Sequence, residues 1–485
     1  MTDRVRRLSP EVGLRPIFRA ARRLPYSSEI SEKMYSLRRI DYRLWFAIIL
    51  AALVPALYST LRVYFLNSLP DTSNVTIAAQ SAWLNLAYEV LQEALLLPLY
   101  YIFGRAIQDR AALRERVGDA FLVTLIAYGI LTFGVLLGAD WLTRAMAQQP
   151  ELQARTSAYL RLEAFGLLIG TLNDISVIVV VALSWRRVLV ALVVLRAILT
   201  VLFDSTFVGQ FSFSLDLGVQ GVALTNIAVG TLLLIPSLAI LSRAGALGMP
   251  RLGRLEGWKK DWLRVALRSG LESGVRNLAF ALMILRLMNE VNEAGLFWMT
   301  NSFIWGWLLL PVLSLGTLIR QDVGNHRGHL DGRLRAYFLL IAIITVVWFA
   351  TIPGWQWFIA HAMGSSDASR IVSLTCLMLG FYIIFALNHV LDSYFYGMGR
   401  TDLMLYQSLF VSVVYYGAAF LAYLGGIFEP DLQAVALLFG GGILIDSAVT
   451  LGQFWRVGYF ERSRIPFSNT QLNESNNREQ HAREL

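Results

Sequence analysis

The 485-residue chain is 56% apolar and only 16% charged, whereas ordinary globular proteins are about 45–50% apolar and about one quarter charged. This composition excludes a soluble multidomain protein and predicts a polytopic membrane protein. The net charge of +8 does not indicate nucleic-acid binding, because surplus Lys and Arg in a membrane protein marks the cytoplasmic loops. The single cysteine, Cys376, and five scattered histidines exclude a disulfide framework and a thiolate cluster, so we expect no resident metal or cofactor.

Apolar stretches long enough to cross about 30 Å of hydrocarbon recur twelve times. The predicted spans cover 43–66, 76–103, 119–142, 158–183, 188–209, 218–242, 269–288, 296–319, 336–359, 370–396, 403–427 and 432–457. The segments between them are alternately rich in arginine and nearly free of Lys and Arg. The positive-inside rule therefore places both termini, Lys259 and His326 in the cytoplasm and Asn74 outside.

The sequence predicts five regions. Residues 1–42 form a basic cytoplasmic tail without a signal-peptide core, and a short amphipathic helix beginning near Pro16 and plain disorder are both open for it. Residues 43–242 and 269–457 form two six-helix lobes, joined by a basic cytoplasmic linker at 243–268. Residues 458–485, rich in Asn, Glu, Arg and Ser, predict a disordered cytoplasmic tail.

An internal repeat relates the two lobes. Residues 220–224, Gln-Gly-Val-Ala-Leu, recur at 433–437 as Gln-Ala-Val-Ala-Leu, a shift of 213. The same shift relates Leu97-Pro98 to Leu310-Pro311 and Arg187 to Arg400. Three matches in one register predict a duplicated six-helix unit. Because six is even, both copies enter the membrane in the same orientation, so we expect an all-α membrane protein of twelve helices in two pseudo-twofold-related lobes.

Several short motifs resemble those of the MATE (multidrug and toxic compound extrusion) transporters, within the multidrug/oligosaccharidyl-lipid/polysaccharide flippase superfamily. They are Ala147–Leu162, Ala182–Arg187, Thr200–Asp204, Gly218–Thr225, Gly397–Asp402, and Pro311 with Gly316. Each motif is weak alone, and their order across residues 43–457 carries the resemblance. It implies a V-shaped antiporter that rocks between inward- and outward-facing states and exports amphipathic, often cationic compounds against a Na⁺ or H⁺ gradient.

Polar groups inside the spans indicate a transport pathway independently, because a charge at the bilayer centre costs at least about 2.5–3.5 kcal/mol. The candidate site residues in the first lobe are Arg62, Asn85, Glu89, Asp174, Arg196, Thr200 and Asp204, and those in the second are Asn301, Trp305 and Asp392. The first-lobe spans hold five acids (Glu89, Glu93, Glu163, Asp174, Asp204) against three arginines (Arg62, Arg161, Arg196). A cation is therefore expected to bind there.

The resemblance also implies a position for the coupling ion. An Asn and an Asp four residues apart in the fifth span contribute to a cation site in the family, and here these positions hold Thr200 and Asp204. The family's acid in the first span falls at Ser59, and the acid of some members in the seventh span falls near Phe280. We expect Na⁺ or H⁺ coupling through Asp204, supported by Glu89 or Asp174.

Structural explanations compete with these roles. Arg196 is equally able to neutralise Asp204 or Asp174, which would leave no vacant ion site. Glu272 with Arg276 is expected to be a structural ion pair, and Asn388 with Asp392 to stabilise helix contacts. His326 and His329 have metal-like spacing but lie in a basic loop without a third ligand. Trp305 fits either an interfacial aromatic belt or a cation–π contact with substrate.

Three function classes remain. The leading hypothesis is a monomeric exporter in the bacterial inner membrane, not an enzyme, with an organic substrate, membrane lipid and Na⁺ or H⁺ as its partners. A flippase for a lipid-linked oligosaccharide would share the fold, but its cavity is expected to be more basic. A membrane-embedded enzyme using His389 lacks the converging groups that a reaction needs.

Overall fold

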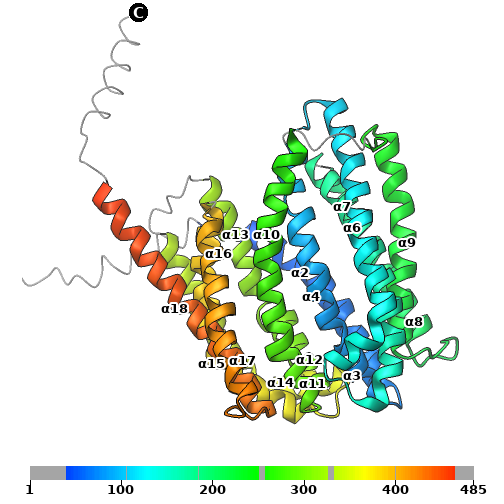
Figure 1. Ribbon diagram of the computed structural model, residues 1–485, viewed down its shortest axis with the longest axis vertical. Coiled ribbons are helices and arrows are strands. Elements are labelled where there is room, and N and C mark those ends of the chain that lie inside the picture. Colours follow the sequence, from blue (N-terminus) through cyan, green and yellow to red (C-terminus); the bar gives the residue numbers. More distant parts are fainter. Residues whose placement is uncertain are drawn as a thin grey trace, which may run out of the picture.

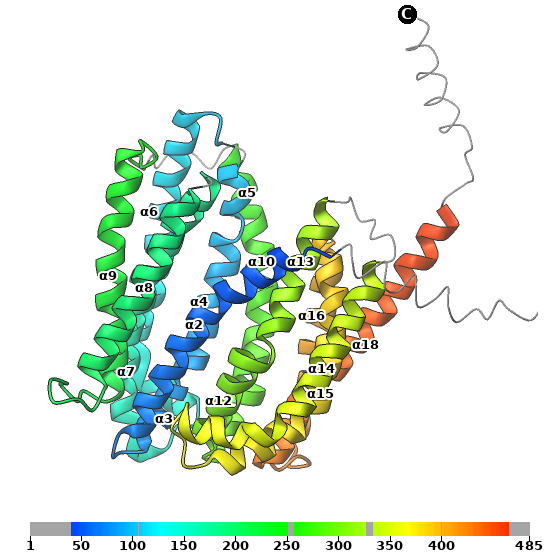
Figure 2. The same ribbon diagram turned by 180° about the vertical axis from the view of Figure 1, so that it is seen from behind.

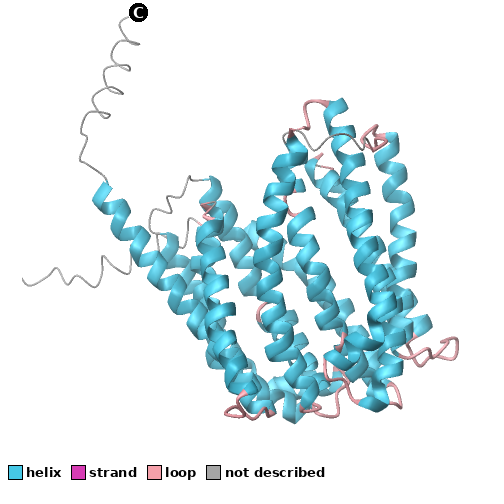
Figure 3. Cartoon of the chain, in the orientation of Figure 1, coloured by secondary structure: helices cyan, strands magenta, loops and turns pink. Residues whose placement is uncertain are grey.

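The computed structural model describes residues 40–104, 106–183, 185–250, 257–325, 333–398 and 400–464. All regular structure in these ranges is helical (Figure 3). The predicted helix near Pro16 and the pair His326 and His329 lie outside the described residues. The final helix continues to Arg464 and so includes 458–464 of the predicted tail.

The helices divide at the linker between residues 244 and 257. The N-terminal half contains α2 (Tyr42–Ser68), α3 (Ser73–Ala79), α4 (Ser81–Leu91), η1 (Gln92–Leu96), α5 (Leu99–Gly104), α6 (Arg110–Ala145), η2 (Pro150–Leu152), α7 (Gln153–Ala182), α8 (Arg186–Phe207) and α9 (Val219–Arg243). The C-terminal half contains α10 (Trp258–Phe280), η3 (Ala281–Leu285), α11 (Arg286–Glu290), α12 (Ala294–Phe303), η4 (Ile304–Leu308), α13 (Leu310–Asn325), α14 (Arg333–His361), α15 (Ala368–Gly397), α16 (Thr401–Phe410), η5 (Val411–Tyr415), α17 (Tyr416–Leu424) and α18 (Leu432–Arg464).

The predicted all-helical, multi-pass membrane fold is confirmed. Among the described residues, nine helices are long and apolar enough to cross a bilayer, and α12–η4 with α13 form a tenth candidate that bends by 52°. The predicted spans 76–103 and 269–288 do not qualify by length and composition, because they are broken into shorter helices and carry several charged side chains. The number twelve therefore stays a prediction.

The two halves are arranged side by side. In Figure 1, α6 to α9 stand on one side, α15 to α18 on the other, and the two groups diverge toward the top. The top is the linker end, where α9 ends at Arg243 and α10 begins at Trp258; the bottom, where α2 ends and α3 begins, is called the opposite end. Seen from behind, α2 runs obliquely between the halves (Figure 2), and the Trp45 indole donates to the Pro311 carbonyl at 3.3 Å.

Helix α10 belongs to the second half in sequence but packs along α4 and η1 of the first. Three of its side chains donate to backbone carbonyls there: Trp262 to Leu95 (3.0 Å), Ser269 to Glu93 (3.1 Å) and Asn277 to Leu86 (3.1 Å). Each bond satisfies a polar side chain that hydrocarbon cannot solvate. The contact between the halves is therefore polar along much of its length.

The helix boundaries keep the spacing of the sequence repeat. Helix α9 begins at Val219 and α18 at Leu432, which is 213 residues later. The π-helical turns η1 and η4 begin at Gln92 and Ile304, which are 212 residues apart. Helices α9 and α18 therefore begin, and the turns η1 and η4 occur, at matching places in the two halves.

Asn74 ties the opposite end of the N-terminal half together. Its Oδ1 accepts from the Val219 amide at 3.1 Å, at the start of α9. Gly218, just before, has φ +60°, and a Cβ there would lie 2.9 Å from Asn74 Oδ1. Glycine is therefore required at this turn for two reasons, its positive φ and the close approach of α3.

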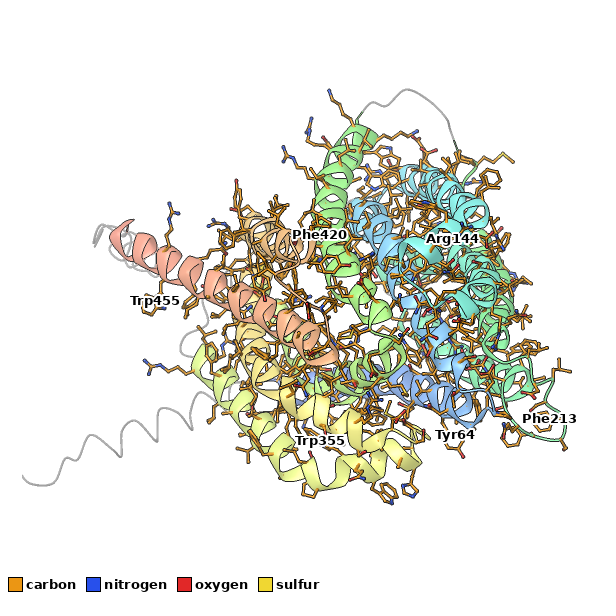
Figure 4. The ribbon with its side chains drawn as sticks, turned by 60° about the horizontal axis from the view of Figure 1, so that its bottom comes forward. Tyr64, Arg144, Phe213, Trp355, Phe420 and Trp455 are labelled. Carbon is orange, nitrogen blue, oxygen red and sulfur yellow. The ribbon has the colours of Figure 1, made fainter. Side chains whose placement is uncertain are left out.

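The outer surface carries apolar side chains in the manner of a protein that faces lipid. Phe213, in the loop before α9, is 61% exposed, and Trp455, on α18, is 72% exposed. Figure 4 shows these two side chains at opposite extremes of the molecule. Ile130, Leu137 and Ile235 are each more than 60% exposed on α6 and α9. Such extensive apolar exposure indicates a lipid-facing surface.

Topology is tested best at exposed positions, because Asn74 is only 4% exposed. Thr72 and Lys260 are exposed at the two ends of the molecule. In a Cys376→Ser background, we expect Thr72→Cys to react with an impermeant maleimide added outside intact cells and Lys260→Cys to react only after permeabilisation. The reverse pattern would contradict the cytoplasmic placement of the linker.

Candidate functional site

The larger of two cavities that we consider lies between the halves and is called the central cavity. Its volume is about 580 Å³. The aromatic residues of its wall come from both halves and are Trp83, Phe280, Phe297, Trp298, Trp305, Phe385, Tyr416 and Phe439. Glu89, Arg276 and Asp446 are the charged residues among those lining it. The cavity thus offers an aromatic wall and a small acidic surplus.

Two predicted site residues, Asn301 and Trp305, line this cavity from α12 and η4. The Trp305 ring is 40% exposed and meets Phe385 edge-to-face, with 5.4 Å between the ring centroids. Tyr382 donates to Asn301 Oδ1 at 3.3 Å. Trp305 is therefore held by aromatic neighbours and stays partly exposed where it lines the cavity.

Four π-helical turns lie on the helices that form the contact between the halves. Leu285 of η3, Trp305 of η4, and Val411 and Ser412 of η5 line the central cavity. The fourth turn, η1, directly follows α4, which contributes Glu89. Such turns are irregularities that occur often at functional sites. Sequence reasoning did not find them, since no single residue type marks a π-helical turn.

A second cavity of about 400 Å³ lies within the N-terminal half and is called the polar cavity. Six predicted site residues line it: Arg62, Asn85, Glu89, Asp174, Arg196 and Thr200. Glu89 lines both cavities and so marks the place where they approach each other. The structure therefore brings together most of the site residues that the sequence predicted in the first half.

Asp204 is paired with Arg62. The Arg62 guanidinium donates to both carboxylate oxygens, from Nε at 2.8 Å and from Nη2 at 3.2 Å, and Asp204 is only 1% exposed. Two parallel charge-assisted bonds are a strong and directional arrangement. The arginine occupies the place that a bound cation would need, and it comes from α2 rather than from Arg196.

Glu163 is satisfied by a neutral partner. Both of its carboxylate oxygens accept from Asn226 Nδ2, at 2.9 and 3.0 Å. Gly166, one turn along α7, permits this close helix contact, since a Cβ there would lie 3.0 Å from the Asn226 Cβ. The sequence counted Glu163 among the acids of the first lobe but gave no sign of its partner on α9.

Asp174 and Arg196 line the polar cavity from α7 and α8. Within the described part of the chain, neither forms an ion pair, although the charge of Arg196 acts on the Asp174 carboxylate across the cavity. Arg62 and Asp204, in contrast, form a direct ion pair. An acid and a base thus face one polar space without neutralising each other by contact.

Arg276 of α10 contacts three carboxylates, two of which belong to the N-terminal half. Its guanidinium lies 2.8 Å from Glu93 and 2.8 Å from Glu272, and 3.7 Å from Glu89. The expected pair of Glu272 with Arg276 is therefore part of a larger cluster that reaches η1 and α4. One positive and three negative side chains make this cluster acidic beside the central cavity.

A second acidic cluster joins α15 and α18. The Asn388 amide nitrogen donates to Asp392 Oδ2 at 3.0 Å and to Asp446 Oδ2 at 3.2 Å, and Thr450 donates to Asp392 Oδ1 at 3.2 Å. Gln407 of α16 approaches both carboxylates. The Asn388 and Gln407 carbonyl oxygens are buried without a hydrogen-bond partner in the described structure. Asp392 was predicted from its own helix, whereas its partner Asp446 lies on another.

His389, the candidate for an enzymatic role, stacks on Phe385 with 5.6 Å between ring centroids. It is 9% exposed. A Cβ at Gly316 would lie 2.2 Å from its Nε2, so the ring packs directly on the α13 backbone. This close packing favours a structural role.

Comparison with solved structures identifies the fold. The chain is similar to an inward-facing multidrug resistance MATE family transporter of the MOP superfamily, with a TM-score of 0.65 at 17% identity over 84% of this chain and 96% of that one. An outward-facing transporter of that description gives 0.60 at 17% identity over 87% and 96%. The MATE multidrug transporter DinF-BH in complex with R6G gives 0.64 at 14% identity over 85% and 95%. No family model and no curated protein matches the chain.

These similarities establish a MATE-like transporter fold, as the motif order in the sequence predicted. At 14–17% identity, the similarity supports the fold alone.

The buried pair of Arg62 and Asp204 predicts a large stability effect. We expect Arg62→Ala to lower the melting temperature of the purified protein by several degrees, because it leaves a buried carboxylate unpaired at a cost of about 3–5 kcal/mol. The double variant Arg62→Leu/Asp204→Leu should recover part of the loss.

The matched control is Arg155→Ala, which breaks an ion pair to Asp71 whose side chains are 47% and 49% exposed. Hydrogen bonds from Ser73 and Arg155 hold the pKa of Asp71 below its ordinary value, yet an exposed pair contributes only about 0–1 kcal/mol. Equal losses in Arg62→Ala and Arg155→Ala would contradict the special role of the buried pair.

Proposed function

We propose that this protein is a secondary active transporter that exports amphipathic, cationic organic compounds from the bacterial cytoplasm by cation-coupled antiport. It acts in the inner membrane with both termini cytoplasmic. The observation that carries the proposal is the aromatic central cavity between two halves of a MATE-like fold, with Glu89 and Asp446 in its wall. The complex of a similar transporter, DinF-BH, with R6G supports a small-molecule substrate for this chain.

The central cavity favours organic cations for two physical reasons. Aromatic faces attract cations through their ring quadrupoles, and the partly exposed ring of Trp305 is placed for such a contact. Two carboxylates against one arginine in the wall add a favourable field in a place of low dielectric. The aromatic area binds the apolar body of the compound, and the acids select its charge.

Our proposal places the coupling ion in the C-terminal half, at Asp392 and Asp446. The sequence favoured Asp204, but that carboxylate is already neutralised by Arg62. In the cluster of α15 and α18, one Asn388 amide bridges two carboxylates, with no arginine bound to either among the described residues. A proton or a Na⁺ ion between the two acids supplies the missing positive charge.

Rotation of the Asn388 amide offers a simple link between ion and structure. With Nδ2 toward the acids, the amide donates to both carboxylates, as observed. Turned by half a rotation, it presents Oδ1, which is the oxygen ligand that a hard cation such as Na⁺ prefers. An ion bound in this way has unequal affinity for the two amide positions, and such a difference is what shifts a conformational equilibrium.

Alternating access requires that bonds between the halves at the opposite end break and re-form. Gln80 and Asn289 exchange two amide hydrogen bonds, at 2.7 and 2.8 Å, and both residues are almost fully buried. Asn67 donates to the Met363 carbonyl at 2.9 Å, and Arg286 to the Ala145 carbonyl at 3.1 Å. These contacts hold the opposite end closed while the helices diverge toward the linker end (Figure 1).

The alternative function is a flippase for a lipid-linked oligosaccharide. A pyrophosphate head favours a cavity with several arginines or lysines. The central cavity instead has Arg276 as the one basic residue among those lining it, and three carboxylates surround that side chain. The charge of the cavity therefore favours the exporter.

Coupling is tested with Asp392→Asn and Asp446→Asn in proteoliposomes. We expect each variant to lose at least about tenfold of its gradient-driven transport, because the site no longer attracts an ion. Asp392→Asn should still bind the fluorescent cation pyrenylmethyl-trimethylammonium with nearly normal affinity, whereas Asp446→Asn also removes a carboxylate from the wall of the central cavity and should bind it more weakly. The control is Asp140→Asn, whose carboxylate is exposed and pairs with Arg161, and it should transport normally. Full transport by both Asp392→Asn and Asp446→Asn would place coupling elsewhere, with Asp204 as the next candidate.

The closed end is tested with Asn289→Ala. Loss of the bonds to Gln80 and the Met146 carbonyl should favour the state that opens at the opposite end. We expect a cysteine at Trp298, in the central cavity, to react faster with an impermeant maleimide from outside in a Cys376→Ser background. Asn173→Ala is the matched control, because its amide bonds to Gly230 within one half. Equal rates in both variants would exclude this end as a gate.

A further inference from the structure

We infer that the polar cavity is a binding site for the zwitterionic head of an amphiphile whose apolar body lies in the central cavity. The inference rests on two observations. Asp174 and Arg196 lie on the wall of the polar cavity, and Glu89 lines both the polar cavity and the central cavity. The inference rests on the proposed export function and names a narrower class of substrate than organic cations.

The charges that line the polar cavity fall into two groups. Arg62 is bound to Asp204, Glu163 accepts twice from Asn226, and Glu89 lies 3.7 Å from Arg276. These three side chains are satisfied by the protein itself. Asp174 and Arg196 are the remaining charged residues of this lining, and neither makes an ion pair with any described residue.

An acid and a base that face a shared cavity without touching are best satisfied by a ligand that carries both charges. Asp174 is half-buried and Arg196 is exposed, so both are accessible to a ligand, and the attraction between opposite charges is stronger where water is partly excluded. A cation alone would satisfy Asp174 and leave Arg196 in repulsion. An anion alone would do the reverse, whereas a zwitterion pairs with both.

The surroundings fit a compact head that combines an ammonium group with a carboxylate or phosphate. The Asn85 and Gln92 amides and the Tyr58 and Tyr88 phenols also line the cavity, and they supply neutral hydrogen-bonding groups around the two charges. A guanidinium binds planar carboxylates and phosphates in a bidentate manner, so Arg196 is the anion partner. Asp174, with Glu89 nearer the central cavity, is the cation partner.

The two cavities match the two parts of an amphiphile, because one has an aromatic wall and the other a polar wall. The central cavity supplies a volume of about 580 Å³ with an aromatic wall, and the polar cavity adds about 400 Å³ lined by charged and amide groups. Glu89 lies on both walls. An ammonium group paired with Asp174 therefore lies on the polar side of this junction, with the anionic arm of the ligand toward Arg196 and its apolar body toward Trp305.

The test compares three pyrene amphiphiles on the purified full-length protein in lipid nanodiscs, by fluorescence anisotropy. The first is pyrenylmethyl-trimethylammonium. The second is its betaine, in which one N-methyl group is replaced by carboxymethyl, and the third is the anion pyrenebutyrate. We expect the betaine to bind about tenfold more tightly than the cation, since one additional charge-assisted contact contributes about that factor. The anion should bind most weakly.

Two variants assign this preference to the polar cavity. Arg196→Gln should reduce the ratio of betaine to cation affinity about tenfold, because it removes the partner of the carboxylate and the repulsion of the cation. Arg161→Gln, which loses an exposed ion pair with Asp140, is the matched control and should keep the ratio. Asp174→Asn should weaken the betaine and the cation together and so change the ratio little.

The outcomes separate this inference from the proposed function. Transport of the cation under an ion gradient, with equal affinity for cation and betaine, would overturn the zwitterion site and leave the exporter standing. A betaine preference that survives Arg196→Gln would also overturn it. Failure of all three compounds to bind would overturn both the zwitterion site and the proposed export of organic cations.

Discussion

The absence of solvating water in hydrocarbon is the constraint on which this structure depends. Every charge placed between the helices must find a partner from another helix or face a cavity. Arg62 and Asp204 meet this demand across 142 residues of sequence, and Glu163 meets it through an uncharged amide on α9. Pairs of this kind fix the mutual positions of α2, α7, α8 and α9, so that the same bonds that remove unpaired charge also define the walls of the polar cavity.

The same constraint explains which helices are least apolar. The segments at 76–103 and 269–288 carry Glu89, Glu93, Glu272 and Arg276, and they are not among the helices that are both long and apolar enough to cross a bilayer. They pack on each other at the centre of the molecule, where their charges form one cluster. A helix that faces protein and cavity rather than lipid does not need a uniformly apolar surface. Low hydropathy at these positions is therefore a consequence of function-bearing contacts between the halves.

Much of the fold was predictable from the sequence, and much of the site was not. The apolar spans, the charge asymmetry of the loops and the 213-residue repeat are local or periodic signals, and the helix boundaries follow them, as α9 and α18 illustrate. Membership of a cavity was also accessible for Asn85, Glu89 and Asp174, since intramembrane polar groups gather there. The hydrogen-bond and ion-pair partners of these polar side chains could not be predicted from the sequence. Asp204 pairs with Arg62 rather than Arg196, and Asp392 shares Asn388 with Asp446, because such choices depend on helix rotation and tilt that no single-helix pattern encodes.

The π-helical turns connect local backbone structure to the contact between the halves. In η1 the regular bonding of an α-helix is disturbed, and the carbonyls of Glu93 and Leu95 accept from Ser269 and Trp262 of α10. A helix turn with irregular bonding can bend at lower cost than a regular one. The equivalent turn η4 contains Trp305 in the other half, and α12–η4 meets α13 at an angle of 52°. In the alternating-access mechanism that we propose, bending at η1 and η4 would let the linker ends of the halves move while α4 and α10 remain in contact. The proposed rocking is then compatible with a polar, extensively bonded contact between the halves.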